Sequence, residues 1–365
     1  MRLLALDIGG LTQDILLFDT SQTIENCIKM VMPSPTITLA NRIIAATGAR
    51  QNLLFTGVNM GGGPSKKALA NHLKAGLKVY ATADAATTFD DDLDEVARWG
   101  VKIIREGEMA QNENIERIET RDLDLSAIEK ALVAFDVDPH FDGVAVAVLD
   151  HGAAPSGVSD RLFRFQHLHR VIQTRRELIA FAYLDNEIPS YLTRMKAVVK
   201  SAGKHISVLV MDTPIAAGLG SLEDKEVGCR AHKVVVNVGN FHTLAFHLHH
   251  DSILGLFEHH TRLLTRNRVE DLIVKLVKGK LTNEEVYNDG GHGCLILESR
   301  KDVPFISVTG PQRALMSGSN LNPYFASPYG DMMLTGCFGL VRAFAHRVET
   351  WRGEMLRALD EHFLH

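Results

Sequence analysis

The chain alternates short apolar runs with amphipathic stretches, and this pattern predicts a mixed α/β protein. Residues 3–8 and 14–18 are expected to be apolar strands joined by a Gly-Gly turn, and residues 25–32 a third strand. Consecutive strands joined by short turns are expected to pair antiparallel. Residues 233–258 repeat this layout of apolar strand, polar residue, x-Gly-x turn and apolar strand. We interpret the two units as an internal repeat of structure.

Helices and strands alternate between and after these two units, which is typical of parallel sheets covered by helices. Residues 33–120 form a self-contained α/β unit of this kind. The expected helices lie at 36–47, 65–75, 84–99, 124–135, 213–220, 267–278 and 331–365. The further expected strands lie at 52–57, 78–82, 101–104, 115–120, 141–149, 205–211 and 305–311.

Composition narrows the class of protein. A length of 365 residues favours two or three domains, and contents of 45% hydrophobic and 23% charged residues are those of a soluble globular protein. The net charge of −5, without a dense basic run, argues against nucleic acid as a partner. No stretch has the length of a membrane span, and no signal peptide is recognisable. The four cysteines are scattered, so we expect reduced thiols and a cytoplasmic location.

The first turn combines a carboxylate with glycines. Asp7 stands near the end of a strand, Gly9 and Gly10 form the turn, and Thr12 and Gln13 follow it. Glycine lets the backbone approach a ligand and turn its N–H groups outward, and an Asp can hold a cation. The pattern predicts a site for phosphate and magnesium. An ordinary hairpin turn is the alternative.

Two later loops also follow predicted strands. One leads into a helix N-terminus, where free N–H groups can bind an anion, although a flexible turn is equally consistent. The other carries Asp150 and His151 past a buried strand, where α/β sheets hold their chemistry, and His suits a general base. A polar loop is the alternative there. The first of these loops consists of Gly61, Gly62, Gly63, Pro64 and Ser65.

The chain contains 17 histidines, several of them on or near the second three-strand unit. One interpretation is a site for Zn or another transition metal, in which the end of that unit meets His151 across a cleft. Structural histidines are the favoured alternative, because no compact ligand spacing is present. The basic segment 161–170 could clamp an acidic ligand, but a solvated face is favoured. The candidate metal ligands are His242, Glu258, His259, His260 and His292.

The order of these motifs resembles the actin-like ATPase superfamily, which includes sugar kinases, Hsp70 and hydantoinase A. Its first phosphate motif looks like residues 7–14, closest to the hydantoinase form Asp-x-Gly-Gly-Thr-x-Thr-Asp. Its interdomain helix motif looks like residues 212–217, its second phosphate motif like 237–243 and its adenosine motif like 308–311. The resemblance implies two duplicated ribonuclease H-like lobes around a nucleotide cleft.

The same resemblance implies a division of the chain. Lobe I would comprise 1–32 and 121–215, with 33–120 as an inserted α/β subdomain. Lobe II would comprise 216–335, and a C-terminal helix at 336–365 would pack back on lobe I.

The resemblance also implies roles for residues. Asp7 would hold magnesium, and His151, oriented by Asp150, would be the base that activates an acceptor. The loop formed by Gly61, Gly62, Gly63 and Ser65 would bind the second substrate. The residues implied to bind nucleotide or phosphate are Gly9, Gly10, Thr12, Gln13, Asn237, Gly239, Asn240, Thr243, Gly310 and Pro311.

Two positions depart from the superfamily pattern. The second aspartate is Asn237, which keeps hydrogen bonds but loses the charge that binds a cation. The adenosine Gly-Gly is Gly310-Pro311, and proline removes an N–H donor. The chain also looks like an uncharacterised prokaryotic family labelled as related to a pyruvate formate-lyase activating enzyme. That label implies three clustered cysteines, which this sequence lacks.

We therefore expect an ATP-dependent phosphotransferase or ATP hydrolase, a kinase-like or ligase-like enzyme that uses Mg-ATP on a small-molecule substrate between two lobes. A non-hydrolysing binding or regulatory protein of the same fold is one alternative, favoured by Asn237. A histidine-dependent metalloenzyme is the other, favoured by residues 258–260 and His292. No membrane partner is expected, and a homodimer is left open.

Overall fold

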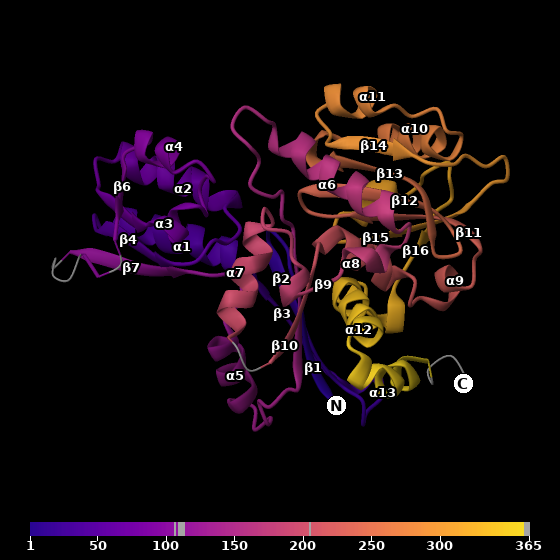
Figure 1. The fold of residues 1–365 in the computed structure, drawn as a ribbon, viewed down its shortest axis with the longest axis horizontal. Helices are drawn as coiled ribbons and strands as arrows, with labels where there is room; N and C mark the ends of the chain where they lie inside the picture. The colour runs from indigo at the N-terminus through magenta and orange to yellow at the C-terminus, as the bar shows by residue number, and fades with distance from the viewer. Residues whose placement is uncertain (106, 109–113, 204–205, 361–365) are drawn as a thin grey trace.

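The computed structural model describes all residues except 106, 109–113, 204–205 and 361–365. Its described residues form two six-stranded sheets and one four-stranded sheet (Figure 1). Residue 205 of the expected strand 205–211, and the last five residues of the expected C-terminal helix, lie outside the described residues.

The first six-stranded sheet has the order β3-β2-β1-β8-β10-β9. The first three strands form the expected antiparallel unit, and β1, β8 and β10 run parallel. Both faces of β1 are covered, so its residues are apolar without alternation. The strands are β1 (Arg2–Ile8), β2 (Thr12–Asp19), β3 (Ile28–Pro33), β8 (Gly143–Val148), β9 (Tyr183–Leu184) and β10 (Ser207–Met211).

The second six-stranded sheet repeats this topology. Its order is β14-β13-β12-β11-β15-β16. The antiparallel strands β11, β12 and β13 match β1, β2 and β3, and the parallel strands β15 and β16 match β8 and β10, whereas each sheet has one further antiparallel edge strand, β9 in the first and β14 in the second. The internal repeat and the duplicated α/β lobes expected from the sequence are thereby confirmed. The strands are β11 (His232–Val238), β12 (His242–His249), β13 (Ser252–His260), β14 (Gly293–Ile296), β15 (Phe305–Thr309) and β16 (Tyr324–Phe325).

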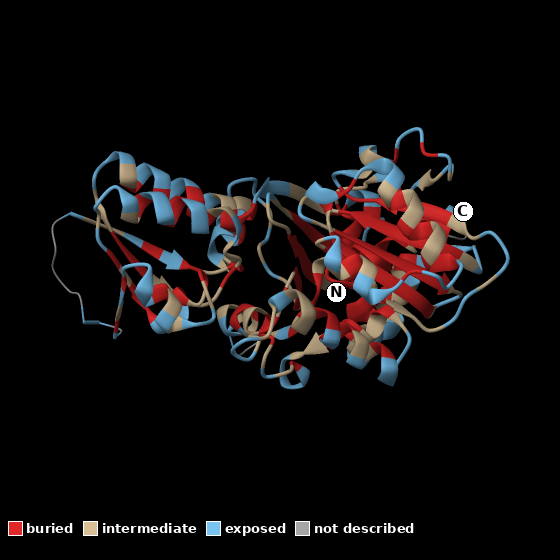
Figure 2. Cartoon of the chain, turned by 90° about the horizontal axis from the view of Figure 1, so that it is seen from above, coloured by how far each residue is buried: buried red, intermediate tan, exposed pale blue. Residues whose placement is uncertain are grey.

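The four-stranded sheet is parallel and stands to one side of the two lobes with its own core (Figures 1 and 2). Its order is β6-β5-β4-β7, within the residues expected for the insert. The domain limits given above stay a prediction. The elements are α1 (Pro35–Gly48), β4 (Asn52–Gly57), α2 (Gly63–Lys74), β5 (Val79–Thr82), α3 (Ala83–Ala86), α4 (Leu93–Arg98), β6 (Val101–Ile104) and β7 (Ile115–Thr120).

The single helix expected at 84–99 is wrong, because the structure has two short helices there, α3 and α4. Between them Phe89 turns inward and packs edge-on against Phe55, with ring centroids 5.0 Å apart. Asp92 then caps α4 by accepting hydrogen bonds from the backbone N–H groups of Asp94 and Glu95. The buried aromatic and the new cap together break the helix, although the helical spacing of apolar residues continues through the turn.

Two helices, α8 (Thr213–Ser221) and α12 (Thr335–Arg347), lie between the six-stranded sheets and join them (Figure 1). A Cβ atom on Gly220 would lie 1.7 Å from the backbone oxygen of Thr335, and one on Gly339 would lie 2.0 Å from that of Ala216. The two helices therefore approach each other closely at these glycines, and a shared core of residues from both lobes surrounds the helix pair.

The remaining helices cover the outer faces and the ends of the sheets. Among the described residues, every helix is too short or too polar to cross a lipid bilayer. These helices, with the central pair, are α5 (Leu125–Val133), α6 (Asp160–Thr174), α7 (Thr193–Ala202), α8 (Thr213–Ser221), α9 (Lys225–Gly228), α10 (Arg266–Val277), α11 (Asn283–Asn288), α12 (Thr335–Arg347) and α13 (Glu349–Asp360).

Candidate functional site

A cleft of about 860 Å³ lies between the two lobes and the insert. Its walls come from the β1–β2 turn, the loop before α2, the loop after β8, the β11–β12 turn and the first residues of α8 and α12. The sequence-predicted residues that line it are Asp7, Gly9, Gly10, Thr12, Gly61, Gly62, Gly63, Asp150, His151, Asn237, Gly239, Asn240, His242, His260, Gly310 and Pro311. Segments far apart in sequence therefore converge on one cavity.

Three predicted ligand-binding side chains are engaged elsewhere. The Gln13 amide donates to the backbone oxygen of Pro33, 3.1 Å away, on the exposed side of the hairpin. The buried Ser65 hydroxyl donates to the carbonyl of Gly62. Thr243 is fully buried, and its hydroxyl is paired with that of Thr261 at 3.0 Å. The structure places all three outside the cleft lining, because local partners and packing hold them.

Asp7 and Asp14 form a pair of buried acids at the first turn. They lie directly opposite each other on β1 and β2, and each has one carboxylate oxygen, Oδ1, without a hydrogen-bond partner. Burial, followed by the charge of Asp14, raises the pKa of Asp7 well above its usual range. Burial likewise raises the pKa of Asp14 to about 7. Carboxylate oxygens are preferred ligands of Mg²⁺, so the unpartnered pair fits such an ion.

The first turn meets its counterpart from the second lobe. Gly9 donates to the carbonyl of Thr12 at 2.9 Å, and Gly239 donates to that of His242 at 3.0 Å, so the two turns have the same hydrogen bond. The ring of Phe241 lies against Gly10, where an added Cβ would approach it to 1.9 Å. The two turns therefore touch through Phe241, which occupies space between them.

Arg164 is the residue that the sequence interpretation missed. Its segment was expected to be a solvated face, but its guanidinium is 1% exposed. It donates to both oxygens of Glu258 at 3.0 and 2.9 Å and to both oxygens of Asp212 at 2.9 and 2.6 Å. Arg164 also donates to the carbonyl of Asp150 at 3.0 Å. The sequence contained one indication of its burial: Arg164 lies four residues before Leu168, and residues four apart on a helix share a face, which is buried at Leu168.

Three histidines meet at the wall of the cleft. His151, His242 and His292 each offer a ring nitrogen, and these nitrogens lie within 4.8 Å of one another. The His260 ring centroid lies 5.0 Å from that of His242 and 4.9 Å from that of His292. Glu258 is paired with His242, whose Nδ1 lies 3.1 Å from its carboxylate. The structure thus brings together four of the candidate histidines.

His259 does not belong to this cluster. Adjacent residues of a strand point to opposite faces, so His259 lies on the other side of β13 from its neighbours Glu258 and His260. Its Nε2 lies 3.4 Å from the carboxylate of Asp289 instead. The interpretation of residues 258–260 as one set of metal ligands is therefore wrong, because His259 lies on the opposite face of the strand.

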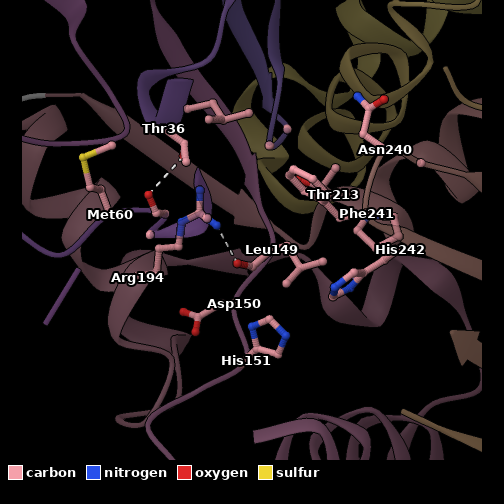
Figure 3. Close-up of a pocket in the computed structure, with 18 of the residues that line it drawn as sticks. Thr36, Met60, Leu149, Asp150, His151, Arg194, Thr213, Asn240, Phe241 and His242 are labelled. Atoms are coloured by element: carbon pink, nitrogen blue, oxygen red, sulfur yellow. Dashed lines mark hydrogen bonds between the residues drawn. The ribbon is translucent and has the colours of Figure 1, made fainter. Parts of the chain in front are cut away.

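Asp150 does not orient His151 as expected. Its carboxylate accepts hydrogen bonds from the backbone N–H groups of Gly152 and Met195 at 2.8 and 3.0 Å, and it points away from the His151 ring (Figure 3). Burial raises the pKa of Asp150 to about 6. Burial and the charge of Arg164 hold the pKa of His151 well below its usual range. Asp150 is therefore better suited than His151 to accept a proton near neutral pH.

Two further histidines of the cluster, His260 and His292, are also neutral near pH 7. Burial lowers the pKa of His260 to about 4 and that of His292 to about 3. Neutral imidazole is the form that binds metal ions.

Several solved structures resemble the chain over most of its length. EutJ, an ethanolamine utilization protein from Carboxydothermus hydrogenoformans, is 10% identical over 93% of this chain and 89% of its own, with a TM-score of 0.34. A ROK family transcriptional regulator, a homologue of the E. coli MLC protein, is 9% identical over 99% and 81%, with a TM-score of 0.36. Lmo2764 from Listeria monocytogenes, described as "a putative N-acetylmannosamine kinase", is 10% identical over 95% and 99%, with a TM-score of 0.36.

Among curated proteins, none matches the sequence. A family model does match residues 60–315, which is more than half of the chain. Its description names an activating enzyme, but the four cysteines lie in separate parts of the fold, and no cysteine joins the metal-ligand group found among the described residues. The chain belongs to the family described as "Putative pyruvate format-lyase activating enzyme (DUF1786)".

Proposed function

We propose that this protein is a phosphate- or nucleotide-dependent enzyme that acts on a small molecule in the interlobe cleft. The observation that carries the proposal is the buried, unpartnered Oδ1 of Asp7 beside the point where the glycine turns of the two lobes meet. Small-molecule sites commonly have volumes of roughly 300–1,000 Å³. The cleft, at about 860 Å³, has room for a nucleotide and a small acceptor.

The residues present fit magnesium and phosphate. Asp7 and Asp14 would hold the cation through their free oxygens, and the turns at Gly9 and Gly239 would lie against the phosphates. When bound, Mg-ATP supplies the phosphoryl group. Asp150, with its pKa of about 6, would accept the proton of the acceptor. The loop at 61–63 would contact that acceptor from the side of the insert.

A second candidate function is ligand binding without hydrolysis. It is favoured by Phe241, whose ring occupies space next to Gly10, and by Asn237, which supplies an amide where the superfamily has a second carboxylate. In such a protein the two lobes would close on a nucleotide or phosphate ligand without transferring a phosphoryl group.

Thermal-shift titration with Mg-ATP, Mg-ADP and inorganic phosphate tests the proposal. A ligand at 100 times its Kd stabilises the folded state by about 2.7 kcal/mol, so the wild type should show a clear rise in Tm. Asp7→Asn should abolish that rise and yet raise the Tm of the ligand-free protein at neutral pH, because it removes a carboxyl group whose ionisation is opposed by burial and by Asp14 in the folded state. Asp251→Asn, an exposed change in the β12–β13 turn, is the control.

A wild type that shifts with none of these ligands would contradict the proposal. A shift with Mg-ATP, but no release of ADP in the presence of candidate acceptors, would favour the non-hydrolysing function.

A further inference from the structure

We propose that His151, His242 and His292 form a site for one divalent transition-metal ion of the zinc class, distinct from the magnesium and phosphate site. Three imidazoles are a ligand set that suits zinc and its neighbours. Their nitrogens lie within 4.8 Å of one another. A tetrahedral ion with Zn–N bonds of about 2.0–2.1 Å needs nitrogens about 3.4 Å apart, so small ring movements complete the site.

His292 is the strongest single indication of an ion. Its side chain is completely buried, and among the described residues neither Nδ1 nor Nε2 has a hydrogen-bond partner; the Glu258 carboxylate lies 3.7 Å from Nδ1, beyond hydrogen-bond distance. Leaving a buried polar group unpaired costs about 1–3 kcal/mol, and buried polar groups in folded proteins are nearly always paired. A structural histidine at this position would be expected to have a partner. A metal ion would pair one of these nitrogens.

The surroundings of the cluster also resemble those of a metal site. Glu258 is paired with Nδ1 of His242, which leaves the other ring nitrogen for the ion. A carboxylate behind a ligating histidine fixes the tautomer and the orientation of the ring. Glu258 is itself held by two hydrogen bonds from Arg164, so this support is rigid.

The three ligands come from both lobes. His151 follows β8 in the first lobe, whereas His242 begins β12 and His292 precedes β14 in the second lobe. Figure 3 shows the rings of His151 and His242 side by side on the cleft wall. An ion bound here would connect the lobes across the cleft, and metal binding should therefore stabilise their closed arrangement.

The site would leave one coordination position open toward the cavity. His151 and His242 line the cleft, and His292 lies behind them. Three protein ligands with an exchangeable fourth position are typical of catalytic zinc sites, whereas structural sites have four protein ligands. The fourth ligand would be water or an oxygen or nitrogen donor of a small molecule in the cleft.

Titration of chelator-stripped full-length protein with Co²⁺ alone tests the site. We expect one Co²⁺ per chain, a visible absorption band of a four-coordinate ion, and displacement of that band by Zn²⁺. His151→Gln, at a partly exposed position, should weaken Co²⁺ binding by more than about 100-fold, since even supporting residues behind a metal ligand contribute 10–100-fold. His292→Gln should do the same, and each variant is first checked for its Tm in chelator.

Two controls separate this site from its alternatives. His140→Gln alters a histidine that is 69% exposed, and Asp7→Asn alters the proposed magnesium ligand, so both should keep the cobalt band. Fewer than about 0.1 ions per chain, or an unchanged band in His151→Gln, would overturn the metal site. Loss of the band in Asp7→Asn would also overturn it, by assigning the ion to the acidic pair. Because no nucleotide is added, these outcomes do not depend on the proposed phosphate chemistry.

Discussion

Replacement of Arg164 by methionine tests how the two lobes are held together. The buried guanidinium makes hydrogen bonds to Glu258 on β13 and to Asp212 at the end of β10. Methionine fills similar space but leaves two carboxylates, 0% and 4% exposed, without a counter-charge. Breaking a buried ion pair by removing one partner costs about 3–5 kcal/mol. We expect Arg164→Met to lower the free energy of unfolding by at least that amount.

The pH dependence of this loss gives the test its direction. In the wild type, burial would raise the pKa of Glu258, but the charge of Arg164, together with His292 and His242, outweighs burial and holds this pKa well below the usual range. Glu258 therefore contributes stability at pH 5 and above that is lost only in strong acid. In Arg164→Met the folded-state pKa of Glu258 should rise above its unfolded value. The variant should then lose stability as pH rises, and its deficit should widen from pH 5 to pH 8.

Urea unfolding at pH 5, 6.5 and 8 measures the effect. Arg175→Met is the matched control, because Arg175 follows the same helix, is 53% exposed, and makes only a surface ion pair with Glu177. Such pairs contribute about 0–1 kcal/mol. A deficit below about 1 kcal/mol for Arg164→Met, or one that is equal at pH 5 and pH 8, would refute the reasoning.

Three further predictions concern helix packing and buried titratable groups. Gly339→Ala should destabilise the protein by about 1–3 kcal/mol, because the new Cβ would lie 2.0 Å from a backbone oxygen of α8. Burial lowers the pKa of His167 to about 4, so protonation of this ring opposes folding, and the wild type should lose about 2 kcal/mol of its free energy of unfolding between pH 7 and pH 5. His167→Gln should remove this loss. Burial raises the pKa of Asp14 to about 7, so its ionisation opposes folding, and the wild type should lose about 3 kcal/mol of its free energy of unfolding between pH 5 and pH 8. Asp14→Asn should remove this loss.

Unfolding in urea monitors all three, and Gly339→Ala has a matched control variant. Gly353→Ala in α13 meets only the end of Arg357, 3.8 Å away, and should stabilise by up to about 1 kcal/mol; a similar gain for Gly339→Ala would contradict the packing argument. For His167→Gln, the gain in free energy of unfolding over the wild type should grow as pH falls. For Asp14→Asn, that gain should grow as pH rises. A difference that is constant with pH would exclude the proposed titration.

Local patterns predicted the elements better than the side-chain contacts. The hairpin at Asp7 and its counterpart at Asn237 were found because apolar strands and glycine turns are properties of neighbouring residues. The turn at 87–92 was missed because Phe89 leaves the helical path to pack on Phe55, a contact 34 positions away that the local pattern does not contain. The same limit applied to Arg164. Its position on the helix face indicates that the side chain is buried, but not that Glu258 and Asp212 are its partners.

The sequence by itself determined the duplicated fold and several of the turns and loops that line the cleft, because strand ends and turns follow from hydrophobic periodicity. Only the tertiary structure decided which polar groups meet there. It paired Arg164 with Glu258 and Asp212, turned Asp150 away from His151, and separated His259 from its neighbours. The histidine cluster joins residues 151, 242 and 292, which come from three separate segments of the two lobes. Their proximity depends on how the lobes pack around α8 and α12, which no local pattern of residues encodes.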